Sequence, residues 1–272
     1  MNSVVRSPLK WVDSKASVIA ELRRHLTKGK RLIEPFTGSA TVFLNTEYDA
    51  YLLSDINGDL INMFNMIKRN PSRFISYAAS LFNNENNPIS YYQLRDEFNR
   101  SGNQFYRAAL FLYLNRHGYN GMCRYNQSGR FNIPFGKYKS PYFPAADIRT
   151  FAEKADKAVF LCMDFSECIE MANPGDVIYC DPPYIPTSKT ADFTAYHTAG
   201  FSIADQQRLA DALRVASARG CHVVASNSYS PEALKIYDGF EINQIDARRS
   251  ISCKSDGRNK AREIIAIMGA SL

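Results

Sequence analysis

Short apolar segments alternate with helical patterns along most of the chain, and this alternation restricts the fold more than any other feature of the sequence. Seven segments are expected to be buried strands because they are short, apolar and bounded by turn residues. They are residues 32–36, 51–54, 158–162, 177–180, 221–226, 240–245 and 263–268, and the last two form a closing pair. Helical patterns at 15–26, 41–46, 204–219 and 231–237 lie between these segments. The order predicts an α/β protein whose sheet is covered by helices on both faces.

Residues 57–145 break this alternation. Their pattern predicts consecutive helices at 59–68, 71–81, 91–99 and 104–116, followed by a loop from 117 to 143 that is rich in glycine, proline and aromatic residues, without a convincing strand. We therefore expect two units. One is a sheet-bearing domain formed by residues 1–56 and 146–272, and the other is a mainly helical insertion formed by residues 57–145.

The net charge of +6 is unevenly distributed along the sequence. Residues 1–31 and 91–142 each carry 8 basic and 2 acidic side chains, and residues 248–272 carry 6 and 2. The basic residues of the 91–142 segment are interleaved with aromatic and amide side chains, a mixture suited to phosphates and base faces. Charge alone leaves nucleic-acid binding and an ordinary solvated helical surface equally open.

Several other classes of protein are disfavoured by what the sequence lacks. It contains no run of 18 uncharged apolar residues and no apolar segment before Lys10, which argues against a membrane span and a signal peptide. The six cysteines never form a CxxC pair and the four histidines never fall at HExxH spacing. We therefore expect a cytoplasmic protein with reduced thiols and no metal site.

The first motif that carries chemistry is the sequence IEPFTGSA at residues 33–40, a predicted strand that runs into a small-residue turn and then a helix. Small residues let backbone amides approach a ligand, and a helix N-terminus favours its anionic or polar end. Asp55 follows about 20 residues later, at the end of the next predicted strand, where a Rossmann-like sheet holds a ribose diol. A glycine turn alone is usually an ordinary connection, but its pairing with Asp55 indicates an adenosine-containing cofactor.

The second motif is the sequence DPPY at residues 181–184, directly after the apolar strand predicted at 177–180. Two consecutive prolines remove two donors and stiffen the turn, so that Asp181, the Pro182 carbonyl and Tyr184 are held in a fixed relation. An exocyclic amine on a heteroaromatic ring is a poor nucleophile because its lone pair is delocalised. A carboxylate and a carbonyl that accept its two N–H groups would free this lone pair, while the Tyr184 ring stacks on the base. The alternative interpretation is a proline-stiffened turn with a buried tyrosine.

DPPY after a hydrophobic strand, with EPFxGS upstream, resembles the amino-methyltransferases that use S-adenosylmethionine. More closely, the chain is similar along nearly its whole length to the Dam-type DNA adenine methyltransferases. The matching segments are residues 9–11, 34–36, 111–126, 131–136, 181–184, 193–197 and 248–252.

This resemblance implies methyl transfer from S-adenosylmethionine to the N6 amine of a flipped adenine in duplex DNA, most commonly within GATC, with S-adenosylhomocysteine as the product. It implies catalytic roles for Asp181, Pro182 and Tyr184. The residues expected to bind the cofactor are Trp11, Lys15, Phe36, Gly38, Ser39, Asp55, Asp164 and Phe165. We expect a monomer that acts in a bacterial or viral DNA context.

The same resemblance assigns DNA contacts to the basic, aromatic segment. Tyr119 and Asn120 would fill the stack around the extruded base, Met122 and Arg124 would read a base pair, and Lys10 would contact the outer guanine of the site. Arg124 suits the two acceptors of guanine. The complete set expected to bind DNA is Lys10, Arg95, Arg116, Tyr119, Asn120, Met122, Arg124, Asn126, Asn132, Pro134 and Lys139.

The sequence departs from the family pattern at the expected cofactor site. Val12, Asp13 and Ser14 stand where a small residue and a glycine usually precede the lysine, and Ala40 stands where a second glycine is common. Asp13 could place a negative charge near the cofactor's carboxylate. These departures favour the alternative of a weakly active or non-catalytic DNA-binding relative, against which the intact DPPY motif argues.

Two further alternatives are disfavoured. The chain contains no Pro-Cys pair, the usual nucleophile motif for C5 methylation of cytosine. Methylation of RNA or of a protein amide is disfavoured because the whole segment expected to contact DNA matches the duplex-DNA group.

Overall fold

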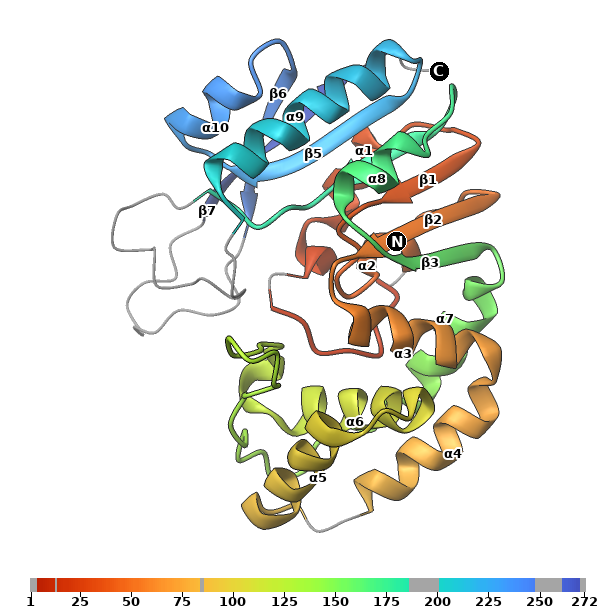
Figure 1. Cartoon of the computed structure of the whole chain (residues 1–272). Coiled ribbons are helices and arrows are strands. Elements are labelled where there is room, and N and C mark those ends of the chain that lie inside the picture. The colour runs from red at the N-terminus through yellow and green to blue at the C-terminus, as the bar shows by residue number, and fades with distance from the viewer. Residues whose placement is uncertain (1–3, 13, 84–85, 186–200, 248–260, 270–272) are drawn as a thin grey trace.

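A computed structural model describes residues 4–12, 14–83, 86–185, 201–247 and 261–269 of the chain. A seven-stranded sheet lies in the upper part of Figure 1, and a set of helices lies below it. The strands are β1 Arg31–Glu34, β2 Ala50–Asp55, β3 Ala158–Cys162, β4 Val177–Cys180, β5 His222–Ser228, β6 Glu241–Ala247 and β7 Ala261–Met268. All seven coincide with or overlap the segments expected from the sequence.

The strands are arranged in the order β3-β2-β1-β4-β5-β7-β6. The first five are parallel, whereas β7 runs antiparallel to both β5 and β6. The chain proceeds outward from β1 through β2 to β3, then returns and proceeds the other way from β4 to β5. The sheet therefore has a topological switch point between β1 and β4, and the crevice at the carboxyl ends of such strands is where open α/β sheets bind ligands.

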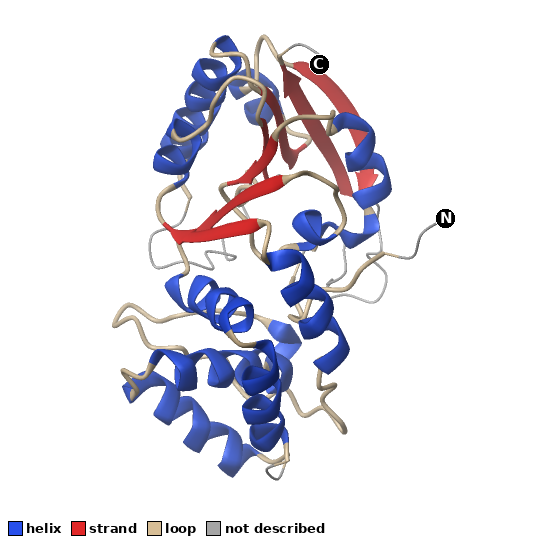
Figure 2. Ribbon diagram, turned by 90° about the vertical axis from the view of Figure 1, so that its right-hand side faces the viewer, coloured by secondary structure: helices blue, strands red, loops and turns tan. Residues whose placement is uncertain are grey.

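Helices cover both faces of the sheet, as Figure 2 shows. One face, which includes Ile33 and Ile178, packs against α8 Phe165–Glu170, α9 Ile203–Ala218 and α10 Pro231–Ile236. The opposite face, which includes Leu32 and Val177, packs against α1 Ile19–His25 and α2 Thr41–Leu44. Because successive side chains of a strand point to opposite faces, a doubly covered parallel strand is apolar at every position. The predicted α/β class, a Rossmann-like sheet with helices on both faces, is confirmed.

The helices between β2 and β3 are α3 Gly58–Arg69, α4 Pro71–Phe82, α5 Pro88–Arg100, α6 Gln104–His117 and α7 Ala145–Ala155. The first four begin after asparagines whose side chains accept hydrogen bonds from the first turn: Asn57, Asn70, Asn87 and Asn103. Asparagine is among the best N-cap residues because its side-chain oxygen satisfies an amide that has no partner inside the helix. Because an asparagine cap marks where each of the four helices begins, their positions could be predicted well from the sequence.

Helix α6 is central to this helical part, because its residues are buried from Ala108 to Asn115. It packs against α3, α4 and α5, and α3 also packs on β2 and β3 of the sheet. One continuous hydrophobic core joins α3 to the sheet face and to the helices below. None of the helices in the described ranges is both long and apolar enough to cross a membrane.

The structure differs from the sequence-based expectations at three places. The helix expected from residue 15 is a 3-10 turn, η1 Lys15–Ser17, followed by α1. Helices α7 and α8 were not expected, although Asp164 and Glu167 form a capping box that signals the start of α8. The loop from 117 to 143 contains a 3-10 turn, η2 Tyr119–Gly121, and two isolated antiparallel bridges, Gly118 with Phe135 and Tyr125 with Phe131.

Candidate active site and DNA-reading loop

The turn after β1 approaches the end of β2 through a backbone contact. The Gly38 amide donates to Asp55 Oδ2 at 3.1 Å, and the Asn57 amide donates to Asp55 Oδ1 at 2.9 Å. Gly38 has a φ of +46°, and a Cβ at this position would lie 3.1 Å from Trp11 Nε1. Both the left-handed backbone conformation and the close indole ring therefore favour glycine at this position. The structure brings together Trp11, Gly38 and Asp55, which the sequence assigned to one site.

Ala40 has a left-handed conformation, with φ of 58° and ψ of 27°, and its side chain is buried. A residue with a Cβ pays about 1–2 kcal/mol for this conformation, which explains the preference for glycine at such a position. The neighbouring Ser39 is also buried, and its hydroxyl lies 2.8 Å from Thr41 Oγ1. Ser39 therefore uses its hydroxyl within the turn.

Aromatic side chains line the sheet edge beside this turn. The rings of Phe36 and Phe165 stack with centroids 5.4 Å apart, and Phe201 packs against both. Asp164 caps α8 by accepting from the Ser166 amide, and Arg208 lies 3.0 Å from its carboxylate. Ile56, which follows Asp55, is 65% exposed although it is apolar. Ile56 was not among the expected site residues, and its exposure is visible only in the structure.

The DPPY turn is anchored by buried polar residues of α9 and β5. Gln206 Nε2 donates to the Pro183 carbonyl at 2.7 Å, and Asn227 Nδ2 donates to Gln206 Oε1 at 2.9 Å. Asn227 Oδ1 also accepts from the Ile185 amide at 3.2 Å, on the far side of the motif. These contacts fix the backbone of the turn on both sides of Tyr184.

Lys15 is inserted among the acidic and aromatic groups of the DPPY turn. Its Nζ lies 2.9 Å from Asp181 Oδ1 and 3.9 Å from Glu263 Oε2, and it donates to the Tyr184 hydroxyl at 2.8 Å. The Tyr184 hydroxyl in turn donates to Glu263 Oε2 at 2.8 Å. Sequence reasoning missed Glu263, which lies on β7. Burial and the nearby charge of Asp181 raise the pKa of Tyr184 well above its usual range, so its hydroxyl stays protonated.

Glu34 lies at the end of β1 and is almost completely buried. Burial, reinforced by the negative charge of Asp181, raises the pKa of Glu34 to about 8. Its Oε1 atom has no hydrogen-bond partner among the residues that the structure describes. A buried carboxyl group of this kind is favoured in the protonated, neutral form at pH 7.

Residues 117–136, here called the reading loop after the role expected from the sequence, lie between the end of α6 and the Lys10 segment. Asn115 holds both: its Oδ1 accepts from the Lys10 amide at 2.8 Å, and its Nδ2 donates to the Lys10 and Gly121 carbonyls at 2.7 and 3.0 Å. Lys10 Nζ donates to the Tyr138 hydroxyl at 2.6 Å, and the Asn120 amide donates to the same oxygen at 2.9 Å. The structure therefore brings Lys10 to Asn120, and adds Asn115 and Tyr138, which were not in the set expected to bind DNA.

Within the reading loop, Arg124 Nε donates to Asn132 Oδ1 at 2.9 Å, and the Asn132 amide donates to the Arg124 carbonyl at 3.1 Å. This pairing leaves the terminal amino groups of the guanidinium outside that hydrogen bond. Tyr119 is 51% exposed, Pro134 is exposed and Met122 is half-buried. These five side chains, which the sequence predicts to contact DNA, therefore lie on one loop.

The other expected DNA-binding residues differ in how far they are engaged within the protein. Arg116 donates to the Pro8 carbonyl, and Arg95 donates to the Ile133 carbonyl at 3.2 Å. Burial lowers the pKa of Arg116 from its ordinary value. Asn126 Oδ1 accepts from the amides of the turn that follows it, whereas Lys139 is exposed.

Some sequence expectations lie outside the described residues: Asp13 and the matching segments 193–197 and 248–252. Among the described residues, no three His, Cys, Asp or Glu side chains are grouped so that they could hold a metal ion.

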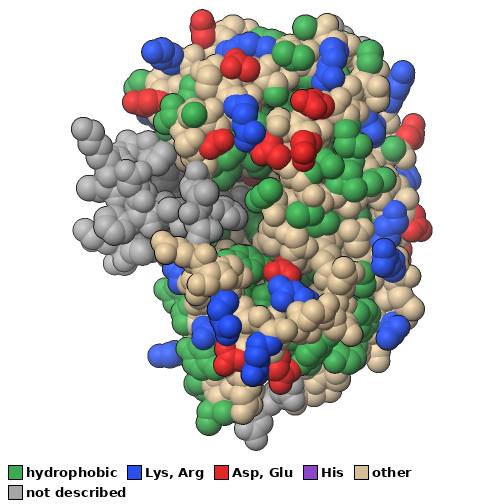
Figure 3. All heavy atoms as spheres, viewed as in Figure 1, with side chains coloured by type: hydrophobic (Ala, Val, Ile, Leu, Met, Phe, Trp, Pro, Cys, Tyr) green, Lys and Arg blue, Asp and Glu red, His purple; other side chains and the backbone are tan. Residues whose placement is uncertain are grey.

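In the space-filling view, the surface is hollowed between the sheet-bearing part and the helical part, with Lys and Arg side chains below the hollow (Figure 3).

An open α/β sheet with a glycine turn and Asp55 beside the switch point, and with DPPY at the end of β4, defines an amino-methyltransferase of nucleic acid or related substrates. The chain belongs to the D12 class N6 adenine-specific DNA methyltransferase family, whose model matches residues 11–251. It is therefore an adenine-specific DNA methyltransferase, and the predicted family and the predicted methylation of adenine in DNA are confirmed.

Two relatives that match over nearly their whole length support this assignment. The Retron Ec67 DNA adenine methylase of Escherichia coli is 48% identical over 264 residues, covering 96% of this chain and 91% of the relative. The DNA adenine methylase of Vibrio cholerae serotype O1 is 46% identical over 264 residues, covering 96% of this chain and 95% of the relative. Among solved structures, a precorrin-6y C5,15-methyltransferase from Geobacter metallireducens has a TM-score of 0.41 at 8% identity, with coverage of 96% and 91%.

Proposed function

We propose that this enzyme uses S-adenosylmethionine to methylate the N6 amine of adenine within GATC in duplex DNA, with the target base flipped out of the helix. The observation that carries the proposal is the position of Asp181 and Tyr184 at the end of β4, directly across the switch point from the glycine turn after β1. S-adenosylhomocysteine is the expected product, and no metal is required.

The residues at the ends of β1, β2 and β3 fit an adenosine-containing cofactor. Asp55 offers a carboxylate for the ribose hydroxyls, and Phe36, Ile56 and Phe165 offer apolar surface for the adenine ring. The left-handed Gly38 lets the backbone and the Trp11 indole approach closely. Ser39 would contribute through its backbone, and Asp164 would contact the adenine edge.

The bound cofactor supplies an electrophilic methyl group on a positively charged sulfur. Asp181 and the Pro182 carbonyl accept the two N–H groups of the target amine, and the Tyr184 ring stacks on the base. The freed lone pair would attack that methyl group, the electron pair of the broken C–S bond would remain on sulfur, and the proton released from the nitrogen would pass to water. Lys15 must move away from Asp181 Oδ1, or share the carboxylate, when the amine binds.

Target reading is assigned to the reading loop and the Lys10 segment. Arg124 would contact guanine through its terminal amino groups, Met122 and Pro134 would make apolar contacts, and Lys10 would contact the outer guanine. Tyr119 and Asn120 would fill the space left by the flipped base, which offsets part of an unstacking cost of a few kcal/mol. The remaining expected contacts are Arg95, Arg116, Asn126, Asn132 and Lys139, of which Lys139 is suited to phosphate.

The sheet-bearing domain of residues 1–56 and 146–272 would carry the cofactor and the chemistry, and residues 57–145 would carry target reading. We also propose that the enzyme acts as a monomer in the cytoplasm of a bacterium or on viral DNA.

The proposal is tested by incubating the purified protein with duplex DNA and S-adenosylmethionine and then mapping methylated adenine with methylation-sensitive nucleases. Protection of GATC sites is the expected result. Methylation at a different site would overturn the assigned sequence, and tight DNA binding without methylation would favour a non-catalytic relative.

A further inference from the structure

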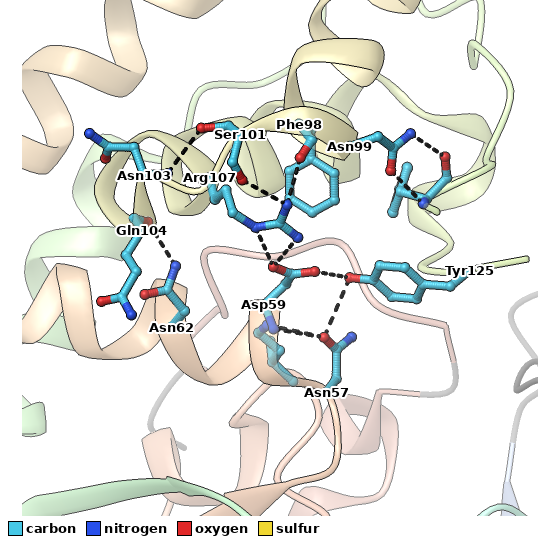
Figure 4. Close-up of polar contacts among 12 residues, drawn as sticks. Asn57, Asp59, Asn62, Phe98, Asn99, Ser101, Asn103, Gln104, Arg107 and Tyr125 are labelled. Carbon is cyan, nitrogen blue, oxygen red and sulfur yellow. Dashed lines mark hydrogen bonds and ion pairs between the residues drawn. The ribbon is translucent and has the colours of Figure 1, made fainter. Parts of the chain in front are cut away.

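Both chain neighbours of Arg124 are tied to the first turn of α3. Asn57 Nδ2 donates to Cys123 Sγ at 3.3 Å, and the Tyr125 hydroxyl donates to Asp59 Oδ2 at 2.7 Å. The same hydroxyl lies 3.5 Å from Asn57 Oδ1. Figure 4 shows Tyr125 pointing toward both Asp59 and Asn57. Two contacts, one on each side, therefore fix the backbone that presents Arg124.

Asp59 is itself firmly held. Arg107 donates to Asp59 Oδ1 from Nε at 3.0 Å and from Nη2 at 2.7 Å, and the two side chains are 25% and 16% exposed. Arg107 Nη1 also donates to the Phe98 and Ser101 carbonyls at the end of α5, at 2.6 and 3.2 Å (Figure 4). Tyr125 is thus bound to a carboxylate whose position is set by α3, α5 and α6 together.

The first turn of α3 also follows directly from the proposed cofactor site. Asp55 accepts from the Gly38 amide through one oxygen and from the Asn57 amide through the other. The Asn57 side chain then caps α3 by accepting from the Asp59 and Leu60 amides at 3.1 and 3.2 Å. A continuous series of hydrogen bonds joins the glycine turn, Asp55 and Asn57 to the neighbours of Arg124.

We propose that Asn57 and Asp59 are positioning residues for target reading, and that they connect the cofactor site to Arg124. The inference rests on the proposed role of Arg124. A carboxylate that is fixed by a guanidinium restricts the Tyr125 side chain, and this restriction keeps Arg124 aligned with one base pair. Because Asp55 belongs to the same hydrogen-bonded series, a cofactor bound to Asp55 stabilises the alignment of Arg124 and so tightens binding of the cognate DNA. The coupling is reciprocal, so cognate DNA increases the affinity for the cofactor by the same factor.

The first test uses Tyr125→Phe, which removes only the hydroxyl, and Cys123→Ala, which removes the thiol that accepts from Asn57. Tyr106→Phe is the matched control, because its hydroxyl donates to Glu97 between α6 and α5 without contacting the reading loop. The measured quantity is kcat/KM on duplexes that differ from the methylated site at one base pair, together with single-turnover rates on saturating cognate DNA.

We expect Tyr125→Phe to reduce discrimination at the base pair read by Arg124 about tenfold, which corresponds to about 1.4 kcal/mol. Cys123→Ala should reduce it a few-fold, since an amide–thiol hydrogen bond is weaker. Single-turnover rates on cognate DNA should stay within about twofold of wild type, because no group that contacts the reacting atoms is changed. Tyr106→Phe should match wild type in both measurements.

The second readout is DNA affinity with and without S-adenosylhomocysteine. The factor by which this ligand tightens cognate DNA binding should fall toward one in Tyr125→Phe. If that variant has a lowered unfolding midpoint, Cys123→Ala carries the comparison.

Wild-type discrimination and an unchanged ligand-dependent factor in both variants would overturn the inference. Arg124→Ala distinguishes a failure of the proposed reading role from a failure of the positioning role. If it leaves discrimination intact, the proposed reading role fails. If it abolishes discrimination while Tyr125→Phe and Cys123→Ala do not alter it, only the positioning role fails.

Discussion

Lys15 Nζ and Asp181 Oδ1 lie 2.9 Å apart, and the lysine side chain is only 8% exposed. This ion pair joins the 3-10 turn at the start of the chain to the DPPY motif after β4. The buried ammonium group is compensated by Asp181 and also by Glu263, whose Oε2 lies 3.9 Å away. The same contact places a cation beside the carboxylate that is proposed to accept the target amine.

Asp181→Asn should reduce methyl transfer by at least about 100-fold, because it removes the negative charge at the point where positive charge develops on the amine. DNA affinity should change little, since the reading loop is untouched. Single-turnover kinetics with saturating DNA and cofactor measure the chemical step, and fluorescence anisotropy measures DNA binding. A variant that retained near-normal turnover would exclude the assigned role.

Glu34 should make the protein less stable as pH rises. The pKa of Glu34 is raised from 4.5 to about 8 in the folded protein, chiefly by burial and then by Asp181. Between pH 4.5 and about 8 the folded state binds more protons than the unfolded state. The contribution of protonated Glu34 to the unfolding free energy is therefore full below pH 4.5 and is lost as pH rises to about 8. The limiting size is about 1.4 kcal/mol for each pKa unit.

Glu34→Gln keeps the shape of this side chain but removes its titration. Relative to wild type, the variant should gain unfolding free energy between pH 5 and pH 8 and then level off, as measured by urea denaturation at several pH values. A difference between the two proteins that stays constant from pH 5 to pH 8 would show that the pKa of Glu34 is not raised in the folded protein.

Ala40 should tolerate glycine but not a branched side chain. In the left-handed conformation, Ala40→Gly relieves backbone strain of about 1–2 kcal/mol. The variant loses a similar amount, because it removes a buried methyl group and gives the unfolded chain more conformational freedom. Its unfolding free energy should therefore stay within about 1 kcal/mol of wild type. Ala40→Val should lose about 2 kcal/mol or more, because a β-branched residue disfavours positive φ and the site is buried. Equal stability of the two variants would contradict the observed conformation.

Arg124→Ala and Lys139→Ala should have different effects on DNA. A guanine contact by Arg124 predicts a loss of about 1–3 kcal/mol of discrimination at one base pair. Because Lys139 is exposed and suited to phosphate, Lys139→Ala should weaken binding to all duplexes alike. It should also reduce the slope of the binding constant against salt concentration by about one counterion. Binding isotherms over a range of salt concentrations distinguish the two, and identical profiles would remove the distinction between base reading and phosphate binding.

The sequence by itself determined the features that depend on neighbouring residues. Strand β4 and the DPPY turn could be predicted because an apolar run that ends in two prolines has few alternative conformations. The helices from α3 to α6 could be predicted because an asparagine and, twice, a following proline mark where each begins. Asp55 was predicted because its distance from the glycine turn is set by one strand–helix–strand unit.

Only the tertiary structure decided which distant residues meet at these sites. Glu263 reaches Tyr184 across 79 positions because the antiparallel β7 is inserted beside β5, and no local pattern encodes that pairing. Tyr138 meets Lys10 across 128 positions, and Asn57 meets Cys123 across 66. The physical reason is that a side chain's local pattern records whether it is buried or exposed, whereas its partner is set by how the strands and helices are brought together.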